Sequence, residues 1–106
     1  MKLGIIIETN EFEKSWNAMR LAVTAKKNGH DVKVFLMGEG VEIETMTHDK
    51  FDVAAQVQAF HGIDGQILAC GTCKQSRNLP GTEVCPINTM IDCMEMIEWA
   101  DKVVTF

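Results

Sequence analysis

Apolar runs of strand length recur along the chain and are separated by longer amphipathic segments. Leu3 to Ile7, Val32 to Met37 and Gln66 to Ala69 are three such runs, and Val103 to Phe106 is a fourth at the chain end. Runs that are apolar almost throughout are typical of strands covered on both faces, as in a parallel sheet. A weaker pattern predicts one more short strand over Thr82 to Cys85.

Helical periodicity fills the intervals between the predicted strands. One apolar face predicts a helix from about Glu11 to Asn28, with Asn10 at its start and Gly29 after its end; this face is formed by Phe12, Trp16, Met19 and Val23. A second helix is predicted from about Asp49 to His61, after a loop over Val41 to Thr47. A last helix is capped by Thr89 and Asp92, and Met90, Cys93, Met94 and Ile97 share one of its faces.

Alternating strands and helices predict an α/β fold: a three-layer parallel sheet with helices on both faces, flavodoxin-like or Rossmann-like. Chemistry in such folds gathers beyond the carboxyl ends of the strands. A flavodoxin-like strand order would make the first and third strands neighbours, so that Glu8, Thr9 and Asn10 lie beside Cys70. Gly38, Glu39 and Gly40 would lie on the same rim.

Length and charge narrow the class of protein. With 106 residues, the chain has room for one domain over residues 1–106. A net charge of −5 gives no broad electrostatic reason to bind nucleic acid directly. No apolar run approaches the roughly 20 residues that span a bilayer. The short apolar run at the N-terminus lacks the other features of a signal peptide, so we expect a cytoplasmic protein.

The chemistry of the chain is concentrated in a C-x-x-C pair that follows the third predicted strand. The pair is Cys70 and Cys73, separated by the turn residues Gly71 and Thr72. A short helix carrying Lys74 and Arg77 follows directly. A helix N-terminus and nearby cations favour negative charge, and the thiolate is the reactive form of cysteine. The pattern therefore predicts a reactive thiol with a second thiol that can share or resolve its chemistry.

Two other uses of the cysteines are less consistent with their positions. Thioredoxin-like proteins carry C-x-x-C after an early strand and before a long helix, whereas this pair lies two-thirds along the chain. Structural zinc usually takes two paired knuckles, and the spacing C-x2-C-x11-C-x7-C offers only one pair. Cys93 fits core packing, and Cys85 is left open as an auxiliary or a buried thiol. His30, His48 and His61 share no metal-ligand spacing and fit solvated or helix-capping roles.

Three segments together resemble the DsrE/DsrF-like family of small sulfur-relay proteins, which includes YchN-type and TusD-like members. The segments are residues 29–41 (GHDVKVFLMGEGV), 69–74 (ACGTCK) and 99–106 (WADKVVTF). They correspond to the family's second strand and its loop, its cysteine turn, and its closing helix and strand. With the opening strand and long helix, the resemblance covers essentially the whole chain.

The resemblance implies a Rossmann-like sheet and a homo- or hetero-oligomer, commonly a trimer or hexamer, and for this chain we expect a homo-oligomer. In the sulfur-transferring members, one cysteine at the end of the third strand carries sulfur as a persulfide. Cys70 stands at that position, and Cys73 falls where many carriers have another residue. The resemblance therefore implies sulfur donor and acceptor proteins as partners and no cofactor. A dithiol redox protein using Cys70 and Cys73, and an oligomeric binding module with structural cysteines, are the alternatives.

Overall fold

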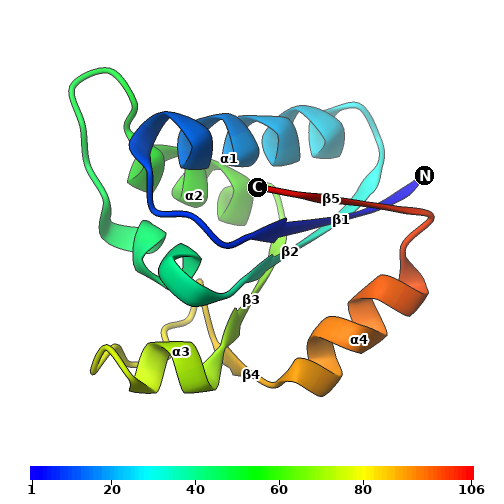
Figure 1. Ribbon diagram of the computed structural model, residues 1–106. Coiled ribbons are helices and arrows are strands. Elements are labelled where there is room, and N and C mark those ends of the chain that lie inside the picture. Colours follow the sequence, from blue (N-terminus) through cyan, green and yellow to red (C-terminus); the bar gives the residue numbers. More distant parts are fainter.

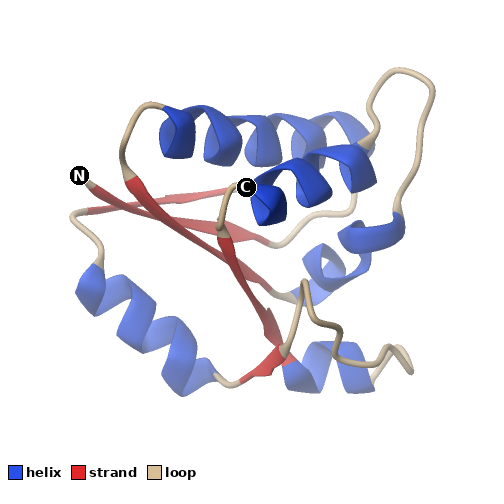
Figure 2. Ribbon diagram, turned by 180° about the vertical axis from the view of Figure 1, so that it is seen from behind, coloured by secondary structure: helices blue, strands red, loops and turns tan.

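The computed structural model describes residues 1–106 as a five-stranded parallel sheet with helices on both faces (Figure 1 and Figure 2). The strands are β1 (Lys2–Ile7), β2 (Asp31–Leu36), β3 (Gln66–Cys70), β4 (Ile87–Asn88) and β5 (Lys102–Thr105). The helices are α1 (Phe12–Lys27), α2 (Val53–Gly62), α3 (Gly71–Gln75) and α4 (Met90–Trp99), with a 3₁₀ helix η1 (Gly38–Thr45). The three-layer α/β fold predicted from the sequence is confirmed.

The strand order is β4-β3-β2-β1-β5, and every neighbouring pair is parallel. The predicted flavodoxin-like order is therefore wrong, because β1 lies between β2 and β5 and does not touch β3. The chain steps in one direction from β1 to β3, and right-handed crossovers place both α1 and α2 on one face. It then returns through α4 on the other face to add β5 beside β1 (Figure 1).

The two faces of the sheet are covered unequally. On one face α1 and α2 pack against each other and against the strands. Met19 of α1 and Val57 and Phe60 of α2 are fully buried in the core on this face. On the other face α4 packs on β1 and β3 (Figure 2). Its inward residues are Cys93 and Met96, whereas Met90, Ile91, Met94 and Ile97 are exposed. The apolar pattern had placed Met90, Met94 and Ile97 on the same face as Cys93.

The strand predicted over Thr82 to Cys85 is not formed. The Thr82 N–H donates to the Cys85 carbonyl at 3.1 Å, and the Cys85 N–H donates to Thr82 Oγ1 at 2.9 Å. This closed turn uses backbone groups that a strand would offer to its neighbour. The short strand β4 begins only after Pro86, and its Asn88 side chain accepts a hydrogen bond from the Ala69 N–H.

Helix boundaries differ from the sequence pattern where side chains cap the backbone. Glu11, not Asn10, caps α1, with its carboxylate accepting from the N–H groups of Glu13 and Lys14. The predicted loop over Val41 to Thr47 is mostly the 3₁₀ helix η1. His48 Nδ1 accepts from the N–H groups of Lys50 and Phe51, and α2 begins only at Val53, where Asp52 caps it by accepting from the Ala55 N–H. The predicted Thr89–Asp92 capping box of α4 is present. None of the helices has the length and apolar character needed to span a membrane.

Candidate functional site

The cysteine turn lies where β3 ends and α3 begins. Cys70 is the last residue of β3 and the N-cap of α3, so that α3 starts at Gly71 and includes Cys73. A side chain at position 71 has no room, because a Cβ there would lie 2.7 Å from Cγ2 of Ile87. The absence of a side chain at Gly71 thus allows β4 to pack tightly against the turn.

The structure brings the two sulfurs of the C-x-x-C pair together. The Sγ atoms of Cys70 and Cys73 lie 3.0 Å apart, and neither cysteine is in a disulfide. The Gly38 N–H donates to Cys73 Sγ at 3.2 Å, so η1 holds this sulfur from the opposite side of the rim. Cys70 is 6% exposed and Cys73 is half-buried. Cys73 is therefore the member of the pair nearer to solvent.

Burial raises the pKa of the Cys70 thiol above its ordinary value, and the neighbouring Cys73 thiol adds to this rise. The backbone N–H groups of Cys73 and Thr72 oppose it, although neither makes a full capping hydrogen bond to the sulfur. The sequence predicted the opposite balance, with the helix N-terminus favouring the thiolate. In a five-residue helix at a buried strand end, desolvation outweighs the effect of the N–H groups.

Lys74 does not face the cysteine pair, contrary to the sequence-based expectation. Its side chain is 1% exposed, and its Nζ donates to the carbonyl oxygens of Pro80 (3.0 Å) and Cys85 (2.9 Å). The ammonium group therefore lies under the loop that follows α3. There it is near the fully buried Cys85, whose pKa is raised to about 12 by burial and by the carboxylate of Glu44 despite the positive charge of Lys74.

Arg77 also points away from the sulfurs and joins a polar network along the rim. Its Nε donates to Glu42 at 2.8 Å, and its Nη1 donates to the Cys73 carbonyl at 3.1 Å. Glu42 accepts a second bond from Asn10 Nδ2 at 3.2 Å, and these two partners hold the pKa of Glu42 below its ordinary value. The network therefore links the loop after β1, η1 and α3, and it fixes the backbone of Cys73.

The other residues predicted for the rim take less direct positions. Glu8 and Glu39 are exposed. Glu8 lies beside Gly38, where an added Cβ would be 3.1 Å from Glu8 Cγ. Because β2 separates β1 from β3, the segment around Gly38 reaches the cysteines and Glu8 does not. The side chain of Thr72 is exposed, and only its backbone N–H acts on Cys70.

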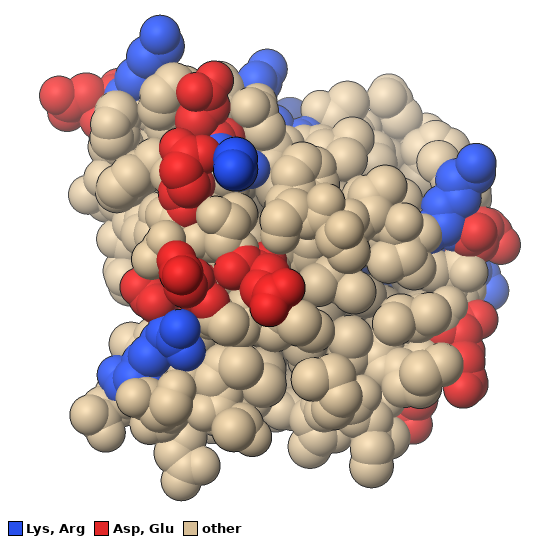
Figure 3. All heavy atoms as spheres, in the orientation of Figure 1, with Lys and Arg blue, Asp and Glu red and all other residues tan.

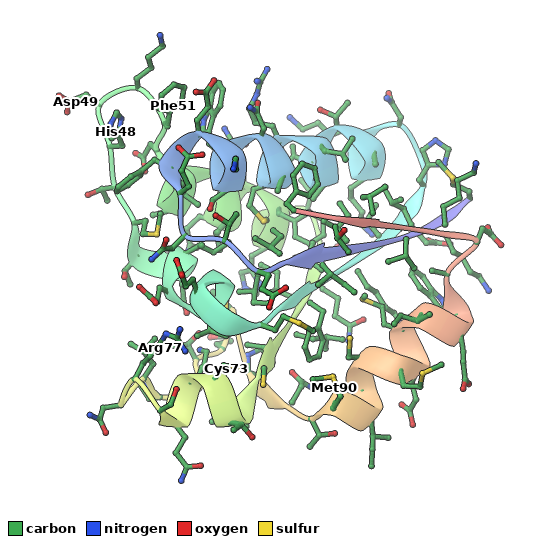
Figure 4. The ribbon with its side chains drawn as sticks, in the orientation of Figure 1. His48, Asp49, Phe51, Cys73, Arg77 and Met90 are labelled. Carbon is green, nitrogen blue, oxygen red and sulfur yellow. The ribbon has the colours of Figure 1, made fainter.

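A hollow of about 460 Å³ borders the cysteine turn, and its opposite wall consists of Ile87, Asn88, Thr89 and Met90. Figure 4 shows Cys73 on α3 and Met90 on α4 at the two sides of this region. Figure 3 shows no charged side chain on the surface between α3 and α4. An approaching molecule therefore meets a largely uncharged entrance to the sulfurs.

The remaining thiol near the pair is Cys93 on α4. It is buried, as expected for core packing, and burial and the nearby Cys70 raise its pKa. No group of three or more His, Cys, Asp or Glu side chains is arranged to hold a metal ion. The arrangement is suited to exchange between sulfurs.

Sequence reasoning missed Gly38 as a donor to Cys73 and Glu42 as the centre of the rim network. Both belong to η1, which the acidic, weakly periodic sequence presented as a loop. Gly40 allows η1 to pack closely against the end of β1, because a Cβ at this position would lie 2.0 Å from the Ile7 carbonyl oxygen. The two glycines that flank Glu39 were the available signal for a close backbone approach.

Comparisons with known proteins identify the family and the fold of the chain. The model of the DsrE/DsrF-like family matches residues 1–106. An uncharacterised protein of Methanocaldococcus jannaschii is 26% identical over 114 residues, covering all of both chains. One of Methanopyrus kandleri is 27% identical over 100 residues, covering 89% of this chain and 83% of the relative. The crystal structure of the ychN protein from E. coli has the same fold, with a TM-score of 0.85 and 20% identity over all of both chains. Since the family model matches every residue of the chain, the protein belongs to the DsrE/DsrF-like family.

Proposed function

We propose that this protein is a sulfur-relay protein that carries sulfur as a persulfide on Cys70. The observation that carries the proposal is the place of Cys70, at the end of β3 with a second sulfur 3.0 Å away. This is the position of the sulfur-carrying cysteine in the sulfur-transferring members that the sequence resembles. Family membership gives the general role its support.

Sulfur uptake is an exchange reaction at the Cys70 sulfur. The Cys70 thiolate attacks the outer sulfur of a donor persulfide, the donor thiolate leaves, and a Cys70 persulfide remains. An acceptor thiolate then attacks that outer sulfur and releases the Cys70 thiolate. The partners are donor and acceptor proteins with accessible thiols, and the exchange itself needs no cofactor. Because burial raises the Cys70 pKa, we expect the uptake rate to rise with pH through and beyond pH 9.

A brief exposure to a cysteine desulfurase, loaded with persulfide and freed of excess cysteine, tests the proposal. Products are trapped within seconds by alkylation and read by mass spectrometry. We expect about 32 Da of added sulfur on Cys70. Cys70→Ser should lose this adduct, and Cys93→Ser, which alters a buried thiol outside the pair, should keep it. An absence of added sulfur on every cysteine, both in the wild type and in Cys73→Ser, where the neighbouring thiol cannot consume the adduct, would contradict the proposal.

The close approach of Cys70 and Cys73 also favours one alternative, a dithiol redox protein. Such a protein would form a reversible Cys70–Cys73 disulfide with a defined potential and take up no persulfide. A binding module with structural cysteines would instead show slow alkylation of all four thiols in the native state. Thiol titration of the folded protein followed by the desulfurase assay separates the three functions.

We further propose that the functional unit, residues 1–106, assembles into a homo-oligomer, a trimer or hexamer, through the outer face of α4. This face exposes Met90, Ile91, Met94 and Ile97 side by side. Contiguous apolar surface of this kind commonly marks a protein interface. Light scattering should give a multiple of the 11.8 kDa chain mass for the wild type and a smaller species for Ile91→Lys. Glu95→Lys, at an exposed polar position of the same helix, is the control.

The cytoplasm is the compartment that fits this chemistry. Four free cysteines, two of them with sulfurs 3.0 Å apart, persist as thiols in a reducing environment. Fractionation of cells expressing the tagged protein, with alkylation at lysis, tests both the location and the thiol state. Recovery from an oxidising compartment with Cys70 and Cys73 joined would contradict this part of the proposal.

A further inference from the structure

We propose that Cys73 resolves the Cys70 persulfide, so that the protein releases sulfide and is left with a Cys70–Cys73 disulfide. This inference rests on the proposed sulfur uptake by Cys70. It adds a second activity, the reductive release of carried sulfur, which occurs when no acceptor thiol takes the sulfur first. A dithiol reductant then returns the protein to its starting state.

The positions of the two sulfurs carry this inference. Cys73 Sγ lies 3.0 Å from Cys70 Sγ, which becomes the inner sulfur of the persulfide. Reacting atoms in near-attack arrangements are about 3 to 3.5 Å apart. A disulfide bond is about 2.05 Å long, so closure needs an approach of about 1 Å within a single helical turn. The Gly38 N–H donates a hydrogen bond to Cys73 Sγ at 3.2 Å, so a group outside the turn also positions this sulfur.

The reaction balances in atoms and electrons. The Cys73 thiolate attacks the inner sulfur, a Cys70–Cys73 bond forms, and the inner-to-outer sulfur bond breaks. The outer sulfur leaves as HS⁻ with the electron pair of the broken bond, while the thiol proton of Cys73 passes to solvent. The outer sulfur is reduced, and the two cysteine sulfurs end as the oxidised disulfide. A dithiol, either a small molecule or a reducing protein, then reduces this disulfide by two exchange steps.

Internal attack has a kinetic advantage over attack by dissolved thiols. Well-oriented groups within one molecule react as if present at about 10⁵ M or more. An acceptor protein can therefore receive the sulfur only if it docks before Cys73 reacts. The inference makes Cys73 the residue that decides between transfer to an acceptor and release as sulfide.

A single-turnover experiment tests the inference. The full chain is reduced, freed of reductant, and mixed with the same persulfide-loaded cysteine desulfurase. Sulfide is measured by bimane trapping, and the protein by mass spectrometry without reduction. In the wild type we expect one sulfide for each Cys70–Cys73 disulfide, seen as a loss of about 2 Da. In Cys73→Ser we expect a Cys70 persulfide that lasts at least about tenfold longer and releases no sulfide. Cys93→Ser should behave as the wild type.

The outcomes separate this inference from the proposed function. A wild-type persulfide as long-lived as that of Cys73→Ser overturns the resolving role of Cys73 and leaves sulfur carriage intact. Sulfide released without an equal amount of disulfide also overturns it. If neither protein gains sulfur, the carrier function itself fails. The ratio of sulfide to disulfide in the wild type tests the inference even if Cys73→Ser does not fold.

Discussion

Cys70 and Cys85 are both almost fully buried, at 6% and 0% exposed, yet their surroundings predict that Cys70 is reactive and Cys85 is not. Cys70 has a second sulfur at 3.0 Å and lies at the edge of a hollow. Cys85 lies beneath the loop after α3, near the Lys74 ammonium group and the Glu44 carboxylate. The ammonium group of Lys74, which follows Cys73 in the sequence, thus lies near Cys85 and not near the Cys70–Cys73 pair. Burial alone does not tell the two apart; the neighbouring sulfur and the path to solvent do.

Alkylation of the native protein should show the largest difference between the two regions. At pH 9, three pH units below a pKa of about 12, only about one Cys85 thiol in a thousand is ionised. We expect the Cys70–Cys73 pair to be labelled by iodoacetamide at pH 9 while Cys85 stays unlabelled. Peptide mass spectrometry at timed intervals gives the rate for each cysteine.

The same labelling in denaturant is the control, because all four cysteines should then react at similar rates. The pH dependence provides a second check. Labelling of Cys70 should keep rising above pH 9, because burial raises its pKa. Equal alkylation rates for Cys85 and the pair in the native protein would show that the loop after α3 does not shield Cys85. The proposed difference in reactivity between the two regions would then be wrong.

Lys74→Met should lower the stability of the protein through the loop that covers Cys85, and this effect should be of intermediate size. The substitution removes two hydrogen bonds from a charged donor and leaves the Pro80 carbonyl without its lysine partner. The Cys85 carbonyl keeps the Thr82 N–H. Because loss of the charge also relieves a desolvation cost, we expect a net fall of about 2 kcal/mol in the free energy of unfolding. Urea denaturation at pH 7 measures it.

Gln75→Met is the matched control, since Gln75 is the next residue of α3 and is exposed. Its unfolding free energy should stay within about 0.5 kcal/mol of the wild type. The alkylation rate of the folded Cys70–Cys73 pair should be the same in Lys74→Met, because its ammonium group points to the loop. A slower rate with unchanged stability would restore Lys74 as a direct support of the reactive thiolate.

These contrasts also mark what sequence reasoning could and could not reach. The apolar runs and helical periods predicted the α/β class, and the C-x-x-C pair after the third strand led to Cys70 and Cys73. Strand order was out of reach, because it depends on α2 packing beside α1 on one face, which places β3 next to β2 and not next to β1. The direction of the Lys74 side chain depends on the carbonyls of a loop that follows it in sequence. Both are decided by packing between distant segments, which local patterns do not record.

Glu42→Gln should have the smallest effect on stability, because it alters a partly exposed ion pair with Arg77 and not a buried group. The side chains of Arg77 and Glu42 are 30% and 37% exposed, and ion pairs of this kind contribute at most about 1 kcal/mol. Arg77 and Asn10 lower the pKa of Glu42 from 4.5 in the folded protein. Its contribution is therefore complete above the unfolded pKa and is lost as the pH falls through the lower, folded value. Denaturation at pH 7 should separate Glu42→Gln from the wild type by less than about 1 kcal/mol, and the two should converge in acid. Glu39→Gln, at an exposed position of the same 3₁₀ helix, should match the wild type at pH 7. A loss of unfolding free energy for Glu42→Gln as large as that for Lys74→Met would mean that the rim around Cys73 contributes as much stability as the region around Cys85. Access to solvent alone would then distinguish Cys70 from Cys85.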